Sequence, residues 1–322
     1  MGILDAELWL PRDVQWSQIP NQVSELFYVP ILAIMIIICR IFYEAFIGII
    51  FARLLGYEKN SWLYSVKNYL FFGFITNRRL KKFVECFFRA SAYLFLFLFG
   101  CYALTDAIWV HDVKYCWIDY PRHNPTKRIR LYYIFQMALY WSLLLSSIID
   151  IRRNDFWIHI LHHSLTLCLL SMSWIINSIR VGTLILVSHD VSDILLELSK
   201  LLRYGPRTAK YAPIVFILFS FCWVITRLIY FPFVILRSAL FDAANLVQPD
   251  YSLFDIFQRP YVPRIMFYLL LLLMALNIYW TNLILRVIIT VIRIGNSKDI
   301  REDDDDEEDD NVVNIPAHKK VQ

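Results

Sequence analysis

The feature that most constrains this chain is a series of apolar runs of about 20 residues, the length that an α-helix needs to cross a bilayer core. Of its 322 residues 58% are hydrophobic, and the mean hydropathy is +0.49. That composition is more apolar than is usual for soluble domains. The runs predict an all-α integral membrane protein with about seven transmembrane helices. The predicted spans are 29–51, 87–109, 130–151, 157–179, 181–202, 212–239 and 263–294.

Charge is divided between a basic body and an acidic tail. Residues 299–310 contain 10 of the 28 acidic residues and one of the 32 basic residues, which leaves a net charge of +13 on the rest of the chain. A basic membrane body suits contact with anionic lipid or with a phosphorylated ligand. The six cysteines form no Cys-x-x-Cys pair, so a disulfide framework or a zinc site is not indicated.

The distribution of basic residues predicts the orientation. Residues 52–86 contain seven Lys or Arg, whereas residues 1–28 contain only Arg12. By the positive-inside rule, the N-terminus faces the lumen and the 52–86 connection faces the cytosol. Seven spans then place the C-terminus in the cytosol. The terminal Lys319-Lys320 pair resembles the dilysine retrieval signal of endoplasmic reticulum membrane proteins, so we expect a multi-pass protein of that membrane.

Two consecutive predicted helices concentrate ionisable residues at membrane depth, where such residues are costly and by default mark a functional path. In each helix these residues are three or four positions apart and therefore share a face. Because the connection near 179–182 is short, we expect antiparallel neighbours whose polar faces meet. The residues are His159, His162, His163 and Thr166 on the first helix, and Asp190, Asp193 and Glu197 on the second, with Lys200 one turn beyond.

This pairing of imidazoles with carboxylates favours acid–base or acyl-transfer chemistry. A carboxylate beside a histidine fixes its tautomer and stabilises the cation that forms on proton transfer. Histidine titrates near neutrality and suits a general base, and imidazole is also a nucleophile toward activated acyl groups. We therefore predict catalytic roles for His162, His163, Asp190 and Asp193.

Structural roles remain as alternatives for the other polar residues. Asp150 and Asp155 suit interfacial charges and a helix cap, and Asn177 and Arg180 lie at the turn between the two polar helices. Arg227 suits either a partner of the polar cluster or a tie between helices. In the first span Arg40 and Glu44 are four residues apart on one face, where they could pair.

A metal site is the competing interpretation of the histidines. The pattern His159-x-x-His162-His163 matches one histidine box of membrane di-iron hydroxylases and desaturases. Such sites need about eight histidines from several boxes, and this chain has seven, of which four lie near the cluster. A mononuclear site with two histidines and one carboxylate remains conceivable. We predict no metal and no cofactor, with a metal-dependent lipid hydroxylase as the weaker alternative.

Longer motifs around these residues resemble the longevity-assurance ceramide synthases over residues 79–295. They are Asp150-Ile-Arg-Arg-Asn-Asp155-Phe, His162-His163-x-x-Thr166, Asn177-x-x-Arg180-x-Gly182-Thr183, His189-Asp190-Val191-Ser192-Asp193-x-x-Leu196-Glu197-x-x-Lys200, Trp223-Val-Ile-Thr-Arg227 and Tyr279-Trp280.

The resemblance implies one peripheral span plus six helices that form a TLC-type barrel around a lipid cavity reached from the cytosol. It implies an N-acyltransferase that forms (dihydro)ceramide from a sphingoid base and a long- or very-long-chain fatty acyl-CoA, the latter as co-substrate. His162 would accept the acyl group or a proton, while His163, Asp190 and Asp193 would orient it and take the amine proton. The supporting residues would be Asp150, Thr166, Asn177, Arg180, His189, Ser192, Glu197, Lys200 and Arg227.

The same resemblance implies the division of the chain and its partners. In the family the loop here at 238–262 influences acyl length. Membrane lipid is an expected partner, a homo- or hetero-dimer with related synthases is open, and no nucleic acid is expected. A lipid-binding or lipid-sensing TLC protein without catalysis, or a transporter-like protein, is the alternative. The predicted parts are a lumenal arm (1–28), a peripheral first helix (29–51), a cytosolic connection without a full homeobox-like domain (52–78), a TLC catalytic domain (79–295) and a disordered acidic cytosolic tail with a dilysine end (296–322).

Overall fold

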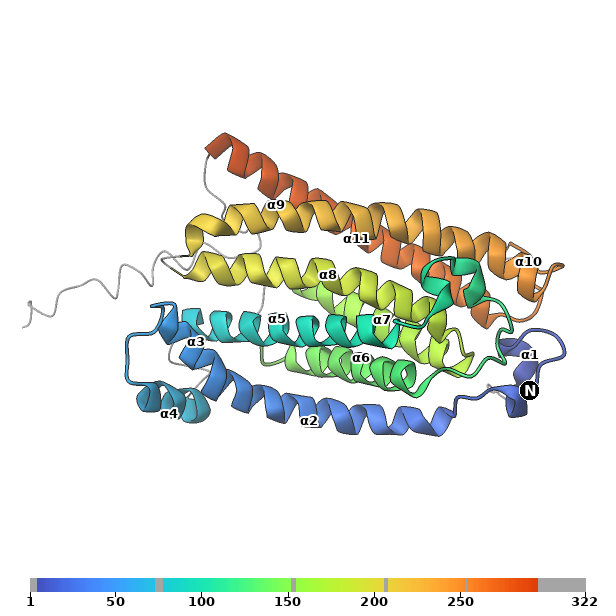
Figure 1. The fold of residues 1–322 in the computed structure, drawn as a ribbon, viewed down its shortest axis with the longest axis horizontal. Helices are drawn as coiled ribbons and strands as arrows, with labels where there is room; N and C mark the ends of the chain where they lie inside the picture. The colour runs from blue at the N-terminus through green and yellow to red at the C-terminus, as the bar shows by residue number, and fades with distance from the viewer. Residues whose placement is uncertain (1–4, 73–77, 152–154, 206–207, 253, 295–322) are drawn as a thin grey trace, which may run out of the picture.

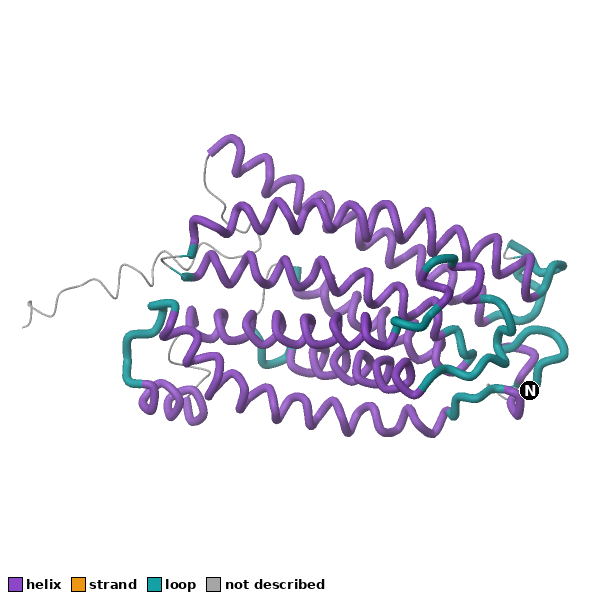
Figure 2. Tube along the Cα trace, in the orientation of Figure 1, coloured by secondary structure: helices purple, strands orange, loops and turns teal. Residues whose placement is uncertain are grey.

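A computed structural model describes residues 5–72, 78–151, 155–205, 208–252 and 254–294. The predicted acidic tail and the Lys319-Lys320 pair lie outside these residues. Within them the long elements are all helices and no strand is found (Figure 2). The seven long helical stretches are α2 with η3 and α3 (Tyr28–Tyr43, Glu44–Gly48, Ile49–Leu54), α5 (Arg78–Ala103), α6 (Lys127–Ser146), α7 (Phe156–Ile175), α8 (Ile179–Tyr204), α9 with η7, η8 and α10 (Ala212–Trp223, Val224–Leu236, Ser238–Asp242, Ala243–Val247), and α11 (Val262–Ile294).

Each stretch overlaps one of the seven predicted ranges, although α5 begins at Arg78 and ends at Ala103, so that the predicted span 87–109 lay too far toward the C-terminus. Five of them are long and apolar enough to cross a membrane: 23–54, 79–103, 156–175, 209–247 and 262–290. The other two, α6 and α8, carry more buried polar side chains. Figure 1 shows the long helices side by side along the long axis of the molecule, with the N-terminal arm at one end and the short helix α4 (Trp62–Phe72) at the other.

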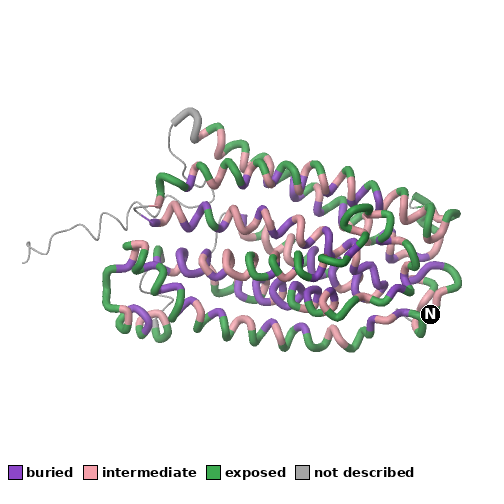
Figure 3. Tube along the Cα trace, in the orientation of Figure 1, coloured by how far each residue is buried: buried purple, intermediate pink, exposed green. Residues whose placement is uncertain are grey.

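The exposed faces of the outer helices are apolar. On α2, Ile31, Ile34, Met35 and Ile38 are each at least half exposed, and α9 and η7 carry a comparable stripe that includes Ile217 and Phe233. Figure 3 shows green, exposed residues along the outer edges and buried residues concentrated between the helices. Apolar side chains that face outward over the length of a helix are accommodated by lipid, so these faces fit a multi-pass membrane protein.

Helix α8 packs most extensively against α5 and α9, and α2 packs along α6. Two glycines permit close approach: a Cβ on Gly100 of α5 would lie 2.5 Å from Val187 of α8, and one on Gly182 would lie 2.3 Å from the Tyr133 hydroxyl. Small residues at helix contacts are the usual device for close packing in membranes. The α5–α8 pair is therefore a fixed wall of the bundle.

The turn between α7 and α8 is as short as the sequence indicated, but the two helices contact each other sparsely along their length. Asn177 takes a positive φ of 57° in this turn. Its side-chain amide donates to the carbonyls of Pro121 (2.6 Å) and His123 (2.8 Å), and its oxygen accepts from Asn21 (2.9 Å). Asn177 therefore ties the turn to the N-terminal arm and the 117–126 loop.

Candidate functional site

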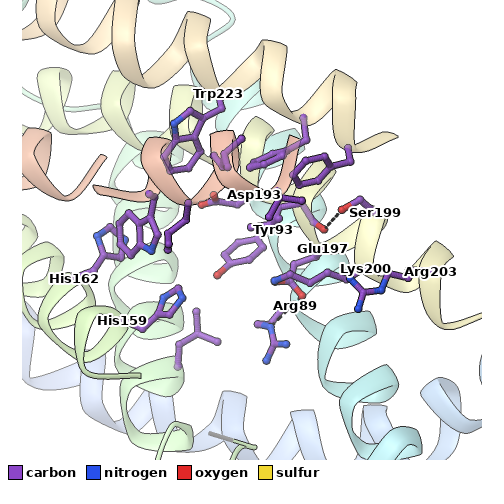
Figure 4. A pocket seen from close by; sticks show the side chains of 18 of the residues that line it. Arg89, Tyr93, His159, His162, Asp193, Glu197, Ser199, Lys200, Arg203 and Trp223 are labelled. Atoms are coloured by element: carbon purple, nitrogen blue, oxygen red, sulfur yellow. Dashed lines mark hydrogen bonds and ion pairs between the residues drawn. The ribbon is translucent and has the colours of Figure 1, made fainter. Parts of the chain in front are cut away.

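A cavity of about 230 Å³ lies among α5, α7, α8, α9 and α11, toward the end of the bundle that carries α4 (Figures 1 and 4). It lies between the histidine face of α7 and the acidic face of α8. The two polar faces were predicted to meet. The described residues make no hydrogen bond from the α7 histidines to Asp190 or Asp193, and both faces border the cavity instead.

Three histidines of α7 line one side of this cavity. The ring centroids of His162 and His163 are 5.5 Å apart, and those of His159 and His163 are 6.2 Å apart. Trp280 of α11 lies edge-on to His162, with centroids 5.1 Å apart. Nδ1 of His162 and of His163 is sealed from solvent without a hydrogen-bond partner among the described residues. Nε2 is therefore the nitrogen that each ring offers to the cavity.

Asp193 borders the same cavity from α8 and is held by an arginine. Arg227 Nη2 donates to Asp193 Oδ1 at 2.8 Å, and its guanidinium lies 4.7 Å from the Trp223 ring. Arg227 belongs to the π-helical stretch η7, and π-helical turns are frequent at functional sites. The two roles that the sequence left open coincide, because Arg227 is a partner of the polar cluster and, through Asp193 and Asn277, also a tie from η7 to α8 and α11.

Asp190 and His189 lie off this cavity. Asp190 faces α6, where Gln136 Nε2 donates to its Oδ2 at 2.6 Å and to the Tyr132 hydroxyl at 3.0 Å. The ring of His189 packs against Phe231, with centroids 5.3 Å apart. Although Asp190 and Asp193 are three residues apart, only Asp193 reaches the cavity, because Asp190 lies toward the α6 side of α8.

A chain of ion pairs forms the outer rim of the cavity and reaches the first long helix. Arg89 of α5 pairs with Glu197 (3.2 Å) and Asp150 (3.7 Å), and Glu197 also accepts from Lys200 at 2.8 Å. Asp150 also pairs with Arg40 (2.7 Å). The predicted pair between Arg40 and Glu44 is confirmed at 2.6 Å.

The remaining predicted residues take supporting positions away from the cavity centre. Thr166 donates to the His162 carbonyl at 2.8 Å, and Ser192 donates to the His189 carbonyl at 2.9 Å. Arg180 binds the carbonyl of Tyr115 (2.8 Å) at the opposite end of the bundle. Asp155 pairs with His159 at 3.0 Å and makes no side-chain capping bond to α7.

A second cavity of about 150 Å³ lies toward the other end of α7 and is mainly apolar. Thr166, Leu169 and Leu170 border it, one to two turns beyond His162 and His163, which border the first cavity. Tyr251, in the loop before α11, and Met266, in the first turns of α11, also line it. The two cavities therefore follow each other along α7, a polar one near the basic end and an apolar one beyond it.

From the sequence, no site role was assigned to Tyr93 or Arg89. Both line the first cavity from α5. Their spacing of four residues puts them on one helix face, which is the signal that could have found them. As for metal, no group of three or more His, Cys, Asp or Glu among the described residues is arranged to hold an ion.

The outward apolar faces, the helical bundle and the internal polar cavity define a multi-pass helical membrane protein with an intramembrane site. Residues 82–286 match the family model of the TLC domain. The chain is 44% identical over 301 residues to ceramide synthase hyl-1 of Caenorhabditis elegans, covering 92% of this chain and 82% of that protein. It is 36% identical over 319 residues to ceramide synthase hyl-2 of the same organism, covering 93% and 92%.

A human relative, ceramide synthase 5, is 38% identical over 225 residues, which is 70% of this chain and 55% of that protein. The chain therefore belongs to the ceramide synthase family of TLC-domain proteins.

Proposed function

We propose that this protein is an N-acyltransferase that joins a sphingoid base to a fatty acyl-CoA and so forms ceramide. The observation that carries the proposal is the likeness to ceramide synthases over more than nine-tenths of the chain. The cavity that holds His162, His163 and Asp193 supports it, because amide formation from a thioester needs a base for the amine proton and a buried place for the acyl carbon.

In this proposal His162 is the acyl- or proton-accepting imidazole. Its Nδ1 is sealed from solvent, which leaves Nε2 as the nitrogen available to the cavity. His163 packs beside it, and Asp193, held by Arg227, lies on the facing helix. Asp190 lies outside the cavity and acts indirectly, because its hydrogen bond from Gln136 connects α8 to α6.

The two consecutive cavities support a long acyl substrate. The polar cavity would hold the thioester and the amine, and the apolar cavity beyond Thr166 would take the acyl chain. Apolar surface removed from water stabilises by about 25 cal/mol per Å², so a chain of many methylenes gains from the second cavity. Tyr251 and Met266 border that cavity, which gives the neighbouring loop a physical route to the choice of chain length.

The basic end of the bundle supports a cytosolic site. Lys200 and Arg203 of α8 line the polar cavity at the end where the basic 52–86 connection lies. By the positive-inside rule this end is cytosolic, where acyl-CoA is supplied. The same proposal includes seven spans arranged as a TLC-type barrel and retention in the endoplasmic reticulum through Lys319-Lys320. It also includes dimerisation with related synthases and a reaction without a cofactor.

The test is ceramide formation in microsomes from cells that express the chain and lack other ceramide synthases. Palmitoyl- to hexacosanoyl-CoA would be supplied with sphinganine, and His162→Ala and Asp193→Ala would be compared with wild type. His111→Ala is the matched control, because His111 is exposed at the far end of the bundle. Full activity of both site variants would remove the site assignment, and an inactive wild type would remove the enzyme assignment.

Two alternatives give different results in that assay. A lipid-binding or lipid-sensing protein of the same fold would retain bound lipid and form no ceramide. A metal-dependent hydroxylase would contain stoichiometric metal after purification and would hydroxylate lipid, which metal analysis and product mass would reveal.

A further inference from the structure

Tyr93 of α5 projects into the middle of the polar cavity. Figure 4 shows its hydroxyl in the space between His159 and His162 on one side and Arg89 and Glu197 on the other. The position is fixed, because α5 packs closely on α8 through Gly100 and because Arg89, one turn before Tyr93, is held by Glu197 at 3.2 Å. The hydroxyl therefore faces the imidazoles across the place that a substrate would fill.

The Tyr93 hydroxyl makes no hydrogen bond to any other described residue, and it is not among the polar atoms that the bundle seals. A phenol hydroxyl removed from bulk water without an acceptor costs about 1–3 kcal/mol. A bound molecule with an oxygen acceptor would recover that cost. The hydroxyl is thus a donor that is open toward the cavity.

Several other polar groups that line the cavity already have a partner or are sealed from solvent. Trp223 Nε1 donates to Thr281 (2.9 Å), Arg227 to Asp193 (2.8 Å), and Ser147 and Ser199 to carbonyls of their own helices. Arg89 and Lys200 pair with Glu197, while Trp280 Nε1 is sealed. Two phenols, Tyr93 and Tyr140, also line the cavity, and neither hydroxyl makes a hydrogen bond to another described residue.

The two phenols differ in position. The ring of Tyr140 packs against His163, with centroids 5.7 Å apart, and so belongs to the wall that carries the imidazoles. Tyr93 lies across the cavity from that wall (Figure 4). Attack on an acyl carbon comes at an obtuse angle to the C=O bond, so the oxygen points to the side and away from the attacking group, clear of the imidazole wall. Only Tyr93 suits that direction.

Resting on the proposed function, we propose that Tyr93 is a catalytic residue that donates a hydrogen bond to the acyl carbonyl oxygen as negative charge develops on it. The amine nitrogen bonds to the acyl carbon and loses its proton to the imidazole, and the carbonyl π pair moves to oxygen, where the Tyr93 O–H stabilises it. The pair returns as the carbon–sulfur bond breaks. The thiolate leaves and takes the proton that the amine lost to the imidazole.

The experiment compares kcat and KM of purified wild type and Tyr93→Phe. Removal of one oxyanion donor lowers kcat on the order of 10²-fold, while KM for acyl-CoA stays within about threefold. A thioether analogue of acyl-CoA, which lacks the carbonyl oxygen, should inhibit both proteins with the same constant. Tyr102→Phe, on the exposed face of the same helix, is the matched control and should keep wild-type kcat.

Several results would overturn the role of Tyr93. An unchanged kcat in Tyr93→Phe would do so, as would a loss confined to Tyr140→Phe. If Tyr93→Phe lost binding of the thioether analogue together with turnover, Tyr93 would have a structural role in shaping the cavity and no catalytic role. None of these results would contradict the proposed function, because the wild type would still form ceramide. A wild type that forms no ceramide would contradict the proposed function itself.

Discussion

The guanidinium of Arg227 and the carboxylate of Asp193 are joined by a 2.8 Å hydrogen bond at the edge of the polar cavity. The side chain of Arg227 is 3% exposed and that of Asp193 is 22% exposed. Arg227 therefore depends on Asp193 for its counter-charge, and Asp193 depends on Arg227 for its orientation toward the cavity. The pair connects η7 to α8.

We expect Asp193→Ala to lose both activity and stability. It leaves the buried Arg227 charge uncompensated, which costs about 3 kcal/mol or more of unfolding free energy. The double variant Asp193→Leu with Arg227→Leu should regain most of the stability, because an apolar pair of similar volume replaces a buried ion pair at little cost. Thermal unfolding in detergent and the ceramide assay measure the two effects.

The double variant is the control for that prediction, since it restores packing without restoring the carboxylate. It should remain inactive. Recovery of ceramide formation in the double variant would show that the carboxylate of Asp193 serves stability alone.

His162→Ala should lower ceramide formation by about 10²–10⁴-fold, the usual contribution of a positioned acid–base group. The ring packs edge-on to Trp280, so His162→Gln is the variant that keeps more of the packing, and it should be equally inactive. The measurement is initial rate at saturating acyl-CoA and sphinganine, with expression checked by immunoblot. A His162→Gln protein with more than a tenth of the wild-type rate would contradict the role.

Arg40→Met should weaken the attachment of the first long helix. Arg40 is 4% exposed, and its loss leaves Glu44 and part of the Asp150 charge without their partner. Breaking such a buried pair costs about 3 kcal/mol. Because Asp150 also pairs with Arg89 on the cavity rim, we expect KM for acyl-CoA to rise as well.

Thermal unfolding and the dependence of rate on acyl-CoA concentration test the Arg40 prediction. Arg53→Met is the matched control, since Arg53 is exposed on the same helical stretch. An Arg40→Met protein with the unfolding midpoint of the control would show that the ion chain does not hold the first helix.

The sequence alone predicted the long helices, because most of the apolar runs are long enough to be recognised by themselves, whereas the run at 181–202 depends on its neighbours. It also predicted which face of α7 carries the histidines, since helical spacing fixes the face. The pair of Arg40 and Glu44 was accessible for the same reason. The bond between Arg40 and Asp150, which are 110 residues apart, could not be predicted in this way. Pairing between helices depends on how the helices pack and leaves no local pattern in the chain.

Two features of the candidate site depend on tertiary geometry in the same way. The sparse contact between α7 and α8 arises because α8 packs on α5 and α9, and no spacing in the sequence predicts that preference. Tyr93 is one of 19 tyrosines, about half of them in apolar runs, so composition gave it no distinction. Only the packing of α5 places its hydroxyl opposite His162 (Figure 4).

His123, in the loop that Asn177 anchors, makes the fold sensitive to acid. Burial, reinforced by the charge of Arg180, lowers the pKa of His123 to about 3. In the unfolded chain it titrates near 6.5, so above pH 6.5 the ring is neutral in both states and its contribution to stability is intact. Below pH 6.5 only the unfolded chain takes up the proton, and the free energy of unfolding falls by roughly 2 kcal/mol between pH 6.5 and 5.

His123→Gln should remove this part of the acid sensitivity. The unfolding midpoint of the variant in detergent should change less between pH 7 and pH 5 than that of wild type. His111→Gln, which alters an exposed histidine at the same end of the bundle, should follow the wild-type curve. The difference in acid sensitivity between wild type and His123→Gln should vanish above pH 7, where the His123 ring is neutral in both the folded and the unfolded state. Parallel curves of unfolding midpoint for the two proteins from pH 7 to pH 5 would show that His123 accepts its proton in the folded protein.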